Sequence, residues 1–155
     1  MLPKSHILIG IIISGLLYFL NIVPLLPVVM IFLSSILIDV DHYLYYIFQE
    51  KDVSLKKAYK WYLMRLKKYR KLSNKEKDKH KNFLLIFHGI EPLLIIYILS
   101  IYFPVLFWVF IGFIIHLITD LTIAHKDRIF NMKLFLTYQI YRHFKLKRLG
   151  IKNPY

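Results

Sequence analysis

The chain has 155 residues, of which 57% are apolar, and a formal net charge of +13. Few soluble domains of this size combine such a charge with a positive mean hydropathy, so the composition indicates a small membrane protein. Cysteine is absent, which excludes a disulfide framework and a thiolate metal site, and metal ligands would have to be His, Asp, Glu, backbone or water.

The basic residues are confined to three regions of the chain. One is Lys4, thirteen lie from Lys51 to Lys81 and eight from Lys126 to Lys152. Residues 5–50 and 82–125 therefore contain no Lys or Arg, and each block is about as long as two membrane spans of about 20 residues. The pattern predicts a single all-α membrane domain with four transmembrane helices, arranged as two hairpins.

Turn signals divide each apolar block in two. The sequence NIVPLLP at 21–27 supplies an Asn and two prolines that break a helix, and Pro104 marks the second turn. A cleaved signal peptide is the alternative for the first span, but the apolar run is long and no small-x-small cleavage site follows it. The expected spans are residues 5–22, 25–42, 83–102 and 105–124.

The distribution of charge also predicts the orientation. Basic residues that flank transmembrane segments stay mainly in the cytoplasm. Four spans place Lys4, the 43–82 loop and the 125–155 tail on one side, whereas the two hairpin turns carry no charge. We therefore expect a multi-pass protein of the cell membrane with both termini cytoplasmic.

Histidines and carboxylates lie at the cytoplasmic end of all four expected spans. Within the last three spans they include pairs three or four residues apart, a spacing that puts two residues on one helix face. Each such pair can therefore point into the bundle at one depth. In chain order the residues are His6, Asp39, Asp41, His42, His88, Glu91, His116 and Asp120.

Carboxylates in these positions need a positive partner. An ionised carboxylate near the membrane interior costs several kcal/mol unless it is paired, and Asp39, Asp41 and Asp120 also face the negative end of a helix dipole. A divalent cation held by imidazoles and carboxylates removes both penalties. We predict one or two metal ions, zinc in the first place and manganese or iron as alternatives. The expected ligands are His6, Asp39, Asp41, His42, His88, His116 and Asp120.

Each of these residues taken singly has another explanation. His6, Asp41 and His42 could be helix-end residues wetted by the headgroup region, and Glu91 could be protonated and hydrogen-bonded within the bundle. The metal prediction depends on the convergence of all of them on four helices.

Two further features concern how the spans pack. Pro92 cannot donate the hydrogen bond that the carbonyl of His88 would accept in a helix, so a kink is expected there. Gly10 and Ser14 form a small-x-x-x-small face that could pack against a helix of the same chain or of a second copy. The sequence therefore leaves open whether the protein forms a homo-oligomer.

The basic segments are expected to lie on the membrane surface. Apolar and aromatic residues recur at spacings of three and four through residues 53–72, which predicts an amphipathic helix, and residues 71–82 are expected to form a flexible link. The tail at 125–155 has a similar pattern. Such helices bind anionic lipid headgroups. Nucleic acid is the rival partner for basic and aromatic runs, but it is not expected because the flanks of a membrane protein account for the same residues.

The order of these motifs resembles the predicted membrane-bound metal-dependent hydrolases, a prokaryotic family of small polytopic proteins. That family has an N-terminal His, then Asp-x-Asp-His, a His that opens a later span, and His-x-x-x-Asp. The resemblance covers residues 6–122, and His80, eight residues before His88, does not match the spacing of the family's additional His. The matching residues are His6, Asp39, Asp41, His42, His88, His116 and Asp120.

The resemblance and the polar cluster together predict a membrane-embedded hydrolase of the cytoplasmic interface, acting on an ester or phosphoester of a lipid headgroup or similar amphiphile. The metal would activate water, with Glu91 or Asp41 as general base. A proton- or ion-linked transporter is the first alternative, because intramembrane His and carboxylates also line ion pathways. A non-catalytic membrane scaffold is the second. The apolar far half of the spans, as at 93–103, favours a one-sided site over a pore.

Overall fold

The structure is a computed structural model, which describes residues 3–79, 85–126 and 134–150. Within these ranges every regular element is a helix, which confirms the all-α class. The helices divide into two compact units, described separately below. The first comprises Met1–Asp39 and Ile86–Leu136, and the second comprises Val40–Leu85 and Thr137–Tyr155.

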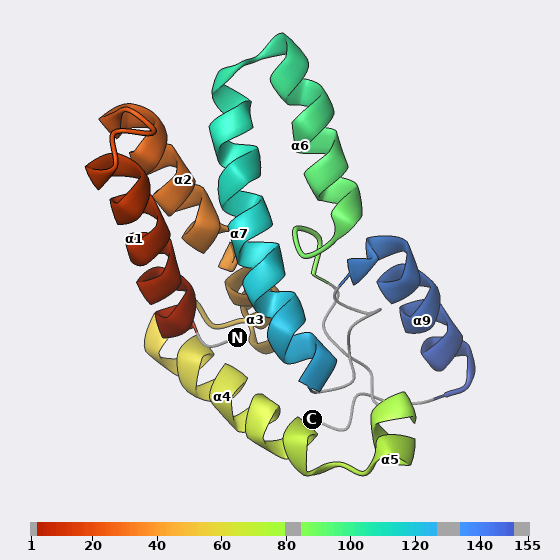
Figure 1. Cartoon of the computed structure of the whole chain (residues 1–155). Helices are drawn as coiled ribbons and strands as arrows, with labels where there is room; N and C mark the ends of the chain where they lie inside the picture. The colour runs from red at the N-terminus through yellow and green to blue at the C-terminus, as the bar shows by residue number, and fades with distance from the viewer. Residues whose placement is uncertain (1–2, 80–84, 127–133, 151–155) are drawn as a thin grey trace. The chain divides into compact units, whose positions relative to one another are not determined.

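The first unit is a small bundle of four helices. Helix α2 packs against both α1 and α7, and α7 also packs against α6 (Figure 1). The connections are short: a turn around Asn21 joins α1 to α2, and Pro104 lies between α6 and α7. The helices are α1 (Pro3–Phe19), α2 (Leu25–Leu37), α6 (Ile90–Tyr102) and α7 (Val105–Lys126).

The turn between α1 and α2 uses the residues that the sequence offered as helix breakers. Asn21 has φ 53°, a left-handed conformation that Asn tolerates better than most residues because its short polar side chain bonds locally. Pro24 then precedes α2 in an extended conformation with φ −62° and ψ 161°. The predicted division of the first apolar block is therefore found within two or three residues of its expected position.

Small residues allow α1, α2 and α7 to approach closely. A Cβ added at Gly10 of α1 would lie 2.7 Å from Ser35 Oγ of α2, and one at Gly112 of α7 would lie 2.5 Å from the Ile31 carbonyl oxygen of α2 and closer still to Ser34 Oγ. Ser34 and Ser35 donate their hydroxyl protons within α2, to Ile31 O at 3.1 Å and to Phe32 O at 2.7 Å. The predicted small face at Gly10 and Ser14 thus packs inside the chain.

The first unit buries polar side chains and exposes apolar ones. Leu8 of α1 is 59% exposed, Leu26 of α2 is 72% exposed and Ile98 of α6 is 55% exposed. A surface of this kind is typical of helices that contact lipid, whose tails are as apolar as leucine. The buried polar residues of the unit are His6, Ser14, Ser34, Ser35, His88, Ser100, His116 and Asp120.

Two segments are long and apolar enough to cross a membrane. They are Leu25–Glu50 and Val105–Thr122, and only 17% of the second is buried. Four spans were expected, but α1 has 17 residues and α6 has 13. At 1.5 Å per residue, α6 is about 20 Å long, short of the hydrocarbon thickness of about 30 Å.

The third apolar segment becomes helical later than the sequence suggested. Residues 86–89 form a bend and α6 begins at Ile90, whereas the expected span began at 83, outside the described residues. Pro92 is therefore the third residue of α6, where a backbone N–H would have no partner within the helix in any case. His88 lies before the helix, so Pro92 removes no helical hydrogen bond to the His88 carbonyl, and the reason for the expected kink does not apply.

The second unit is built on a pair of helices joined by a four-residue connection. Trp61 of α4 contacts Tyr46 of α3 edge to face, with ring centroids 5.5 Å apart, and its Nε1 donates to Glu50 Oε1 at 2.7 Å. The guanidinium of Arg65 lies 4.5 Å from the centre of the Trp61 ring, a cation–π contact. The helices of this unit are α3 (Val40–Glu50), α4 (Leu55–Lys71), α5 (Asn74–Lys79) and α9 (Leu136–Arg148, from Thr137 on).

The basic segments contain more helix than expected. Helix α4 matches the amphipathic helix predicted at 53–72, with Ser54 accepting a hydrogen bond from Lys57 N as its N-cap. The link at 71–82 contains α5, which begins with a capping box in which Ser73 N donates to Glu76 Oε2 at 2.7 Å and Glu76 N donates to Ser73 Oγ at 3.4 Å. Helix α9 covers part of the predicted amphipathic tail at 125–155, of which residues 127–133 and 151–155 lie outside the described ranges.

Gly112→Ala is expected to destabilise the first unit, because the new Cβ would overlap α2 and overpacking costs about 1–3 kcal/mol. Gly15→Ala is the matched control, since a Cβ at Gly15 meets nothing within 4 Å and a helical Gly→Ala change gains up to about 1 kcal/mol. Thermal unfolding in detergent, followed by circular dichroism, should show a lower Tm for Gly112→Ala alone. Equal Tm values in the two variants would contradict the close α2–α7 packing.

Candidate metal centre

Five of the predicted ligands meet in the first unit, at one end of its helices. His6 lies in the first turn of α1, and Asp39 lies in the turn that follows α2. His88 belongs to the bend before α6, and His116 and Asp120 are one turn apart on α7. Three of the ligands come from the end of a helix or from the backbone just outside it, whereas His116 and Asp120 lie farther inside α7. We refer to these five residues as the His/Asp cluster.

Four of the side chains have the spacing of ligands around one ion. His88 Nε2 and His116 Nε2 are 3.2 Å apart. Asp39 Oδ1 lies 3.4 Å from His88 Nε2 and 3.7 Å from His116 Nε2, and Asp120 Oδ2 lies 3.7 and 3.9 Å from the same two atoms. Ligands bound to zinc at about 2.0–2.1 Å in a tetrahedron are separated by about 3.3–3.4 Å. Five of the six separations among the four side chains therefore lie between 3.2 and 3.9 Å, at or somewhat above the edge length of such a tetrahedron.

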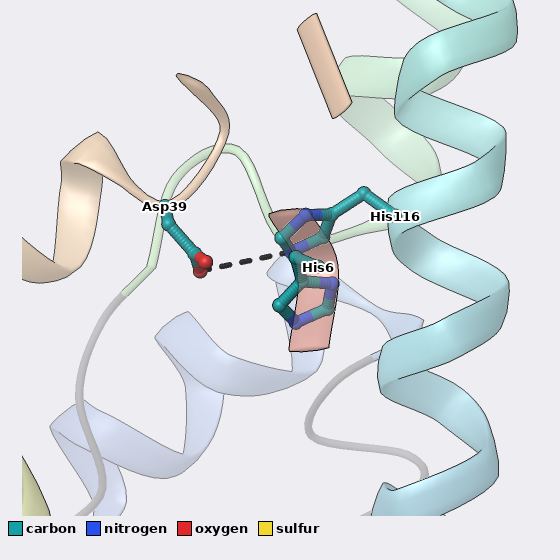
Figure 2. Close-up of side chains that lie close together, drawn as sticks. All are labelled: His6, Asp39 and His116. Carbon is teal, nitrogen blue, oxygen red and sulfur yellow. Dashed lines mark ion pairs between the residues drawn. The ribbon is translucent and has the colours of Figure 1, made fainter. Parts of the chain in front are cut away.

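His6 extends the cluster on the other side of Asp120. Its Nε2 lies 3.3 Å from Asp120 Oδ1, so the two oxygens of Asp120 face different imidazoles. The rings of His6 and His116 are stacked, with centroids 3.9 Å apart and planes 12° apart. Figure 2 shows the two rings side by side, with Asp39 directed toward them. Asp120 therefore contacts three imidazoles of the cluster through its two oxygens.

The cluster is largely shielded from solvent. His88, His116 and Asp120 are each 1% exposed and are among the most deeply buried large side chains of the described residues. The side chain of Asp39, at 17% exposed, is the most open of the group. Charges removed from water in this way require compensation by a partner of opposite sign.

A backbone contact determines which nitrogen of His116 faces the cluster as an acceptor. His116 Nδ1 lies 2.7 Å from the carbonyl oxygen of Ser35. A carbonyl can only accept a hydrogen bond, so Nδ1 carries the proton and Nε2 of the neutral ring keeps its lone pair. That lone pair faces His88 and the carboxylates of Asp39 and Asp120. Donation from Nδ1 to a carbonyl is also the usual arrangement of a metal-bound imidazole.

The distances favour a cation between these groups over direct ion pairs. Hydrogen bonds from a protonated imidazole to a carboxylate are usually about 2.7–2.9 Å long, whereas the N···O separations in the cluster are 3.3 to 3.9 Å. Residues 5–50 and 82–125 contain no Lys or Arg. Two subsets, His6 with Asp39 and His116, and His88 with His116 and Asp120, each present ligand atoms within 4.8 Å of one another. The buried His and Asp groups can therefore hold a metal ion.

Two predicted ligands are found in the second unit. Asp41 and His42 lie in the first turn of α3, and Asp41 is buried. The ring of His42 contacts Tyr62 of α4 edge to face, with centroids 5.0 Å apart. Their role as ligands stays a prediction based on the Asp-x-Asp-His motif.

Glu91, the expected general base, makes a structural contact. Its Oε2 accepts a hydrogen bond from the backbone N–H of Leu136 at 2.8 Å. A Cβ added at Gly89 would lie 3.0 Å from the same oxygen and 3.2 Å from Leu136 N, so the absence of a side chain at Gly89 leaves room for this bond. Catalysis by Glu91 or Asp41 stays a prediction.

Two groups at the cluster were not anticipated from the sequence. The first is the Ser35 carbonyl, which as a backbone atom has no signature in the sequence. The second is Thr119, whose Oγ1 lies 3.1 Å from His6 Nδ1 and donates to the His116 carbonyl at 2.7 Å. The sequence offered one signal for Thr119, namely its position inside the His-x-x-x-Asp motif, directly before Asp120.

Comparison of the chain with protein-family models, curated proteins and solved structures finds no match.

Removal of metal is expected to lower the stability of the wild-type protein. A ligand present at 100 times its Kd stabilises the folded state by about 2.7 kcal/mol, so a chelator should lower the Tm, whereas Asp120→Asn should respond little. Ser100→Ala is the matched control, because Ser100 is a buried polar residue of the same unit that donates to Tyr97 O within α6. Thermal melting with and without chelator measures the effect. An equal shift in Asp120→Asn and the wild type would exclude this cluster as the metal site.

Proposed function

We propose that the chain is a membrane-embedded, metal-dependent hydrolase that acts at the cytoplasmic interface. The observation that carries this proposal is the His/Asp cluster. The contact of Nδ1 with the Ser35 carbonyl leaves the lone pair of His116 on Nε2, and this buried nitrogen lies 3.7 Å from Asp39 Oδ1 and 3.9 Å from Asp120 Oδ2. Such an arrangement is unfavourable when empty and favourable around a divalent cation.

The donor set fits a divalent transition metal. Imidazole nitrogens and carboxylate oxygens suit zinc, and also manganese and iron, while thiolate ligands are excluded by the lack of cysteine. His88, His116, Asp39 and Asp120 would hold one ion. His6 would contribute to a second ion, and Asp41 and His42 are the further ligands that the Asp-x-Asp-His motif predicts. When bound, the metal supplies Lewis acidity and activates water.

The residues of the chain have separate tasks in this proposal. The carbonyl of Ser35 holds His116 in the tautomer that presents Nε2. Asp39 is the most open ligand, so substrate would approach from its side. Asp41 or Glu91 would take the proton from water, and Glu91 also accepts a hydrogen bond from Leu136 N.

A membrane location with four spans is part of the proposal. Two segments are long enough to span a membrane, and α1 and α6 are shorter helices that are also apolar. The apolar outward surface of all four helices and the confinement of charge to residues 4, 51–81 and 126–152 support a multi-pass arrangement with the basic segments and both termini in the cytoplasm. Short helices of this kind are accommodated by local thinning of the bilayer.

The proposed substrate is an ester or phosphoester in a lipid headgroup or a similar amphiphile. The cluster includes residues at the start of α1, after the end of α2 and before α6, a position that corresponds to the headgroup depth in the proposed membrane arrangement. Helices α4 and α9 carry many basic residues, including Lys68, Arg70 and Lys71 in the last turn of α4, and exposed aromatic residues such as Tyr141 at 60% and Phe144 at 56%. Such surfaces bind anionic lipid. The motif resemblance to the predicted membrane-bound hydrolases supports the same reaction class.

The test is the metal content of detergent-purified protein, measured by mass spectrometry for the wild type and for variants. We expect near-stoichiometric metal in the wild type and its loss in His116→Ala and Asp41→Ala. His143→Ala, which changes a histidine of α9 outside the predicted ligands, is the control and should keep its metal. Hydrolysis of a chromogenic phosphodiester, a carboxylic ester and phospholipids in mixed micelles should fall to background in His116→Ala.

Other outcomes would redirect the proposal. Loss of metal in His116→Ala but not in Asp41→Ala would limit the site to the first unit and remove Asp41 from the ligands. A wild type without metal after reconstitution would contradict the hydrolase. Flux of protons or divalent ions in proteoliposomes would then identify the cluster as part of a transport pathway.

A further inference from the structure

We infer that Thr119 is a positioning residue that holds His6 in its metal-binding tautomer. This inference deepens the proposed function and rests on it, since it assigns a role around the same His/Asp cluster. It concerns a side chain that neither the motif spacing nor the metal prediction included.

The two hydrogen bonds of Thr119 can form together in only one arrangement of protons. A threonine hydroxyl has a single proton, and Thr119 Oγ1 donates it to the carbonyl oxygen of His116 at 2.7 Å. Toward His6 Nδ1, at 3.1 Å, the same oxygen can then only accept. His6 Nδ1 must therefore carry the ring proton, and in the neutral ring Nε2 keeps its lone pair.

That lone pair is directed at the cluster. His6 Nε2 is buried, has no hydrogen-bond partner in the described part of the chain, and lies 3.3 Å from Asp120 Oδ1. An acceptor nitrogen facing a carboxylate oxygen is repulsive unless a cation lies between them. Thr119 thus favours the tautomer of His6 with the proton on Nδ1, as the Ser35 carbonyl does for His116. The two rings stack with their planes 12° apart.

The hydroxyl also prevents a competing state. Without it, the proton of His6 can move to Nε2 and donate to Asp120 Oδ1, which would occupy both a ligand nitrogen and a ligand oxygen. Metal binding would then have to break that hydrogen bond and displace a proton. Loss of a group that orients a metal-binding histidine typically weakens metal affinity about 10- to 100-fold.

The chain offers a matched set of substitutions. Thr119→Val replaces the hydroxyl by a methyl group at nearly constant shape, and Thr119→Ser restores the hydroxyl. Thr122→Val is the control: Thr122 makes the same type of bond within α7, from Oγ1 to the Thr119 carbonyl at 2.7 Å, but is exposed.

Two measurements test the inference. Titration of metal-free protein in detergent with Zn²⁺ and Co²⁺ should give a Kd about 10- to 100-fold higher for Thr119→Val, with an altered visible spectrum of the Co²⁺ form, and wild-type behaviour for Thr119→Ser and Thr122→Val. Imidazole ¹⁵N chemical shifts of the metal-free protein should show His6 protonated at Nδ1 in the wild type. The proton should shift to Nε2 in Thr119→Val, a result that does not depend on metal.

The outcomes separate this inference from the proposed function. Metal binding by the wild type with an unchanged Kd, Co²⁺ spectrum and His6 tautomer in Thr119→Val would overturn the inference and leave the hydrolase intact. Failure of Thr119→Ser to restore the wild-type values would overturn it as well, because the hydroxyl would not be the active group. Absence of metal binding in the wild type would overturn both.

Discussion

Compensation of buried charge is the constraint on which the rest of the first unit depends. His6, His88, His116 and Asp120 are nearly inaccessible to solvent, and the Ser35 carbonyl makes His116 an acceptor toward two carboxylates. Polar groups in such a site are tolerated only with a cation or shared protons. The N···O distances, which exceed those of charge-assisted hydrogen bonds, favour the cation.

The close packing of α1, α2 and α7 also helps to orient the ligands of the His/Asp cluster. Gly10 and Gly112 bring α1 and α7 against the serine pair of α2, and the Ser35 that contacts Gly10 also supplies the carbonyl that orients His116. Close approach and ligand orientation therefore depend on the same turn of α2. In this unit, whose outer surface is mostly apolar, small residues and buried polar contacts lie between the helices, and these are the interactions that hold helices together in lipid.

Much of the fold and of the candidate site was predictable from local sequence. The spacing of His116 and Asp120 places both on one face of a helix, and α7 is found within two residues of its expected bounds. The late start of α6 was not predictable, because the bend at 86–89 contacts groups distant in sequence, such as His116 Nε2, which lies 3.2 Å from His88 Nε2. The bond from Leu136 N to Glu91 Oε2 likewise gives Glu91 a structural partner that no local pattern indicates.

The sequence by itself determined the helical class, the separation of apolar and basic segments, and the residue types available as ligands, because these follow from composition and from periodicity along one helix. The tertiary structure decided which ligands meet, which oxygen of Asp120 faces which imidazole, and which ring nitrogens of His6 and His116 carry a proton. The two ring tautomers, for example, depend on groups far apart along the chain: Ser35 O and His116 Nδ1 are 81 residues apart, and Thr119 Oγ1 and His6 Nδ1 are 113 residues apart. Hydrogen-bond geometry between such distant groups exists only once the helices have packed.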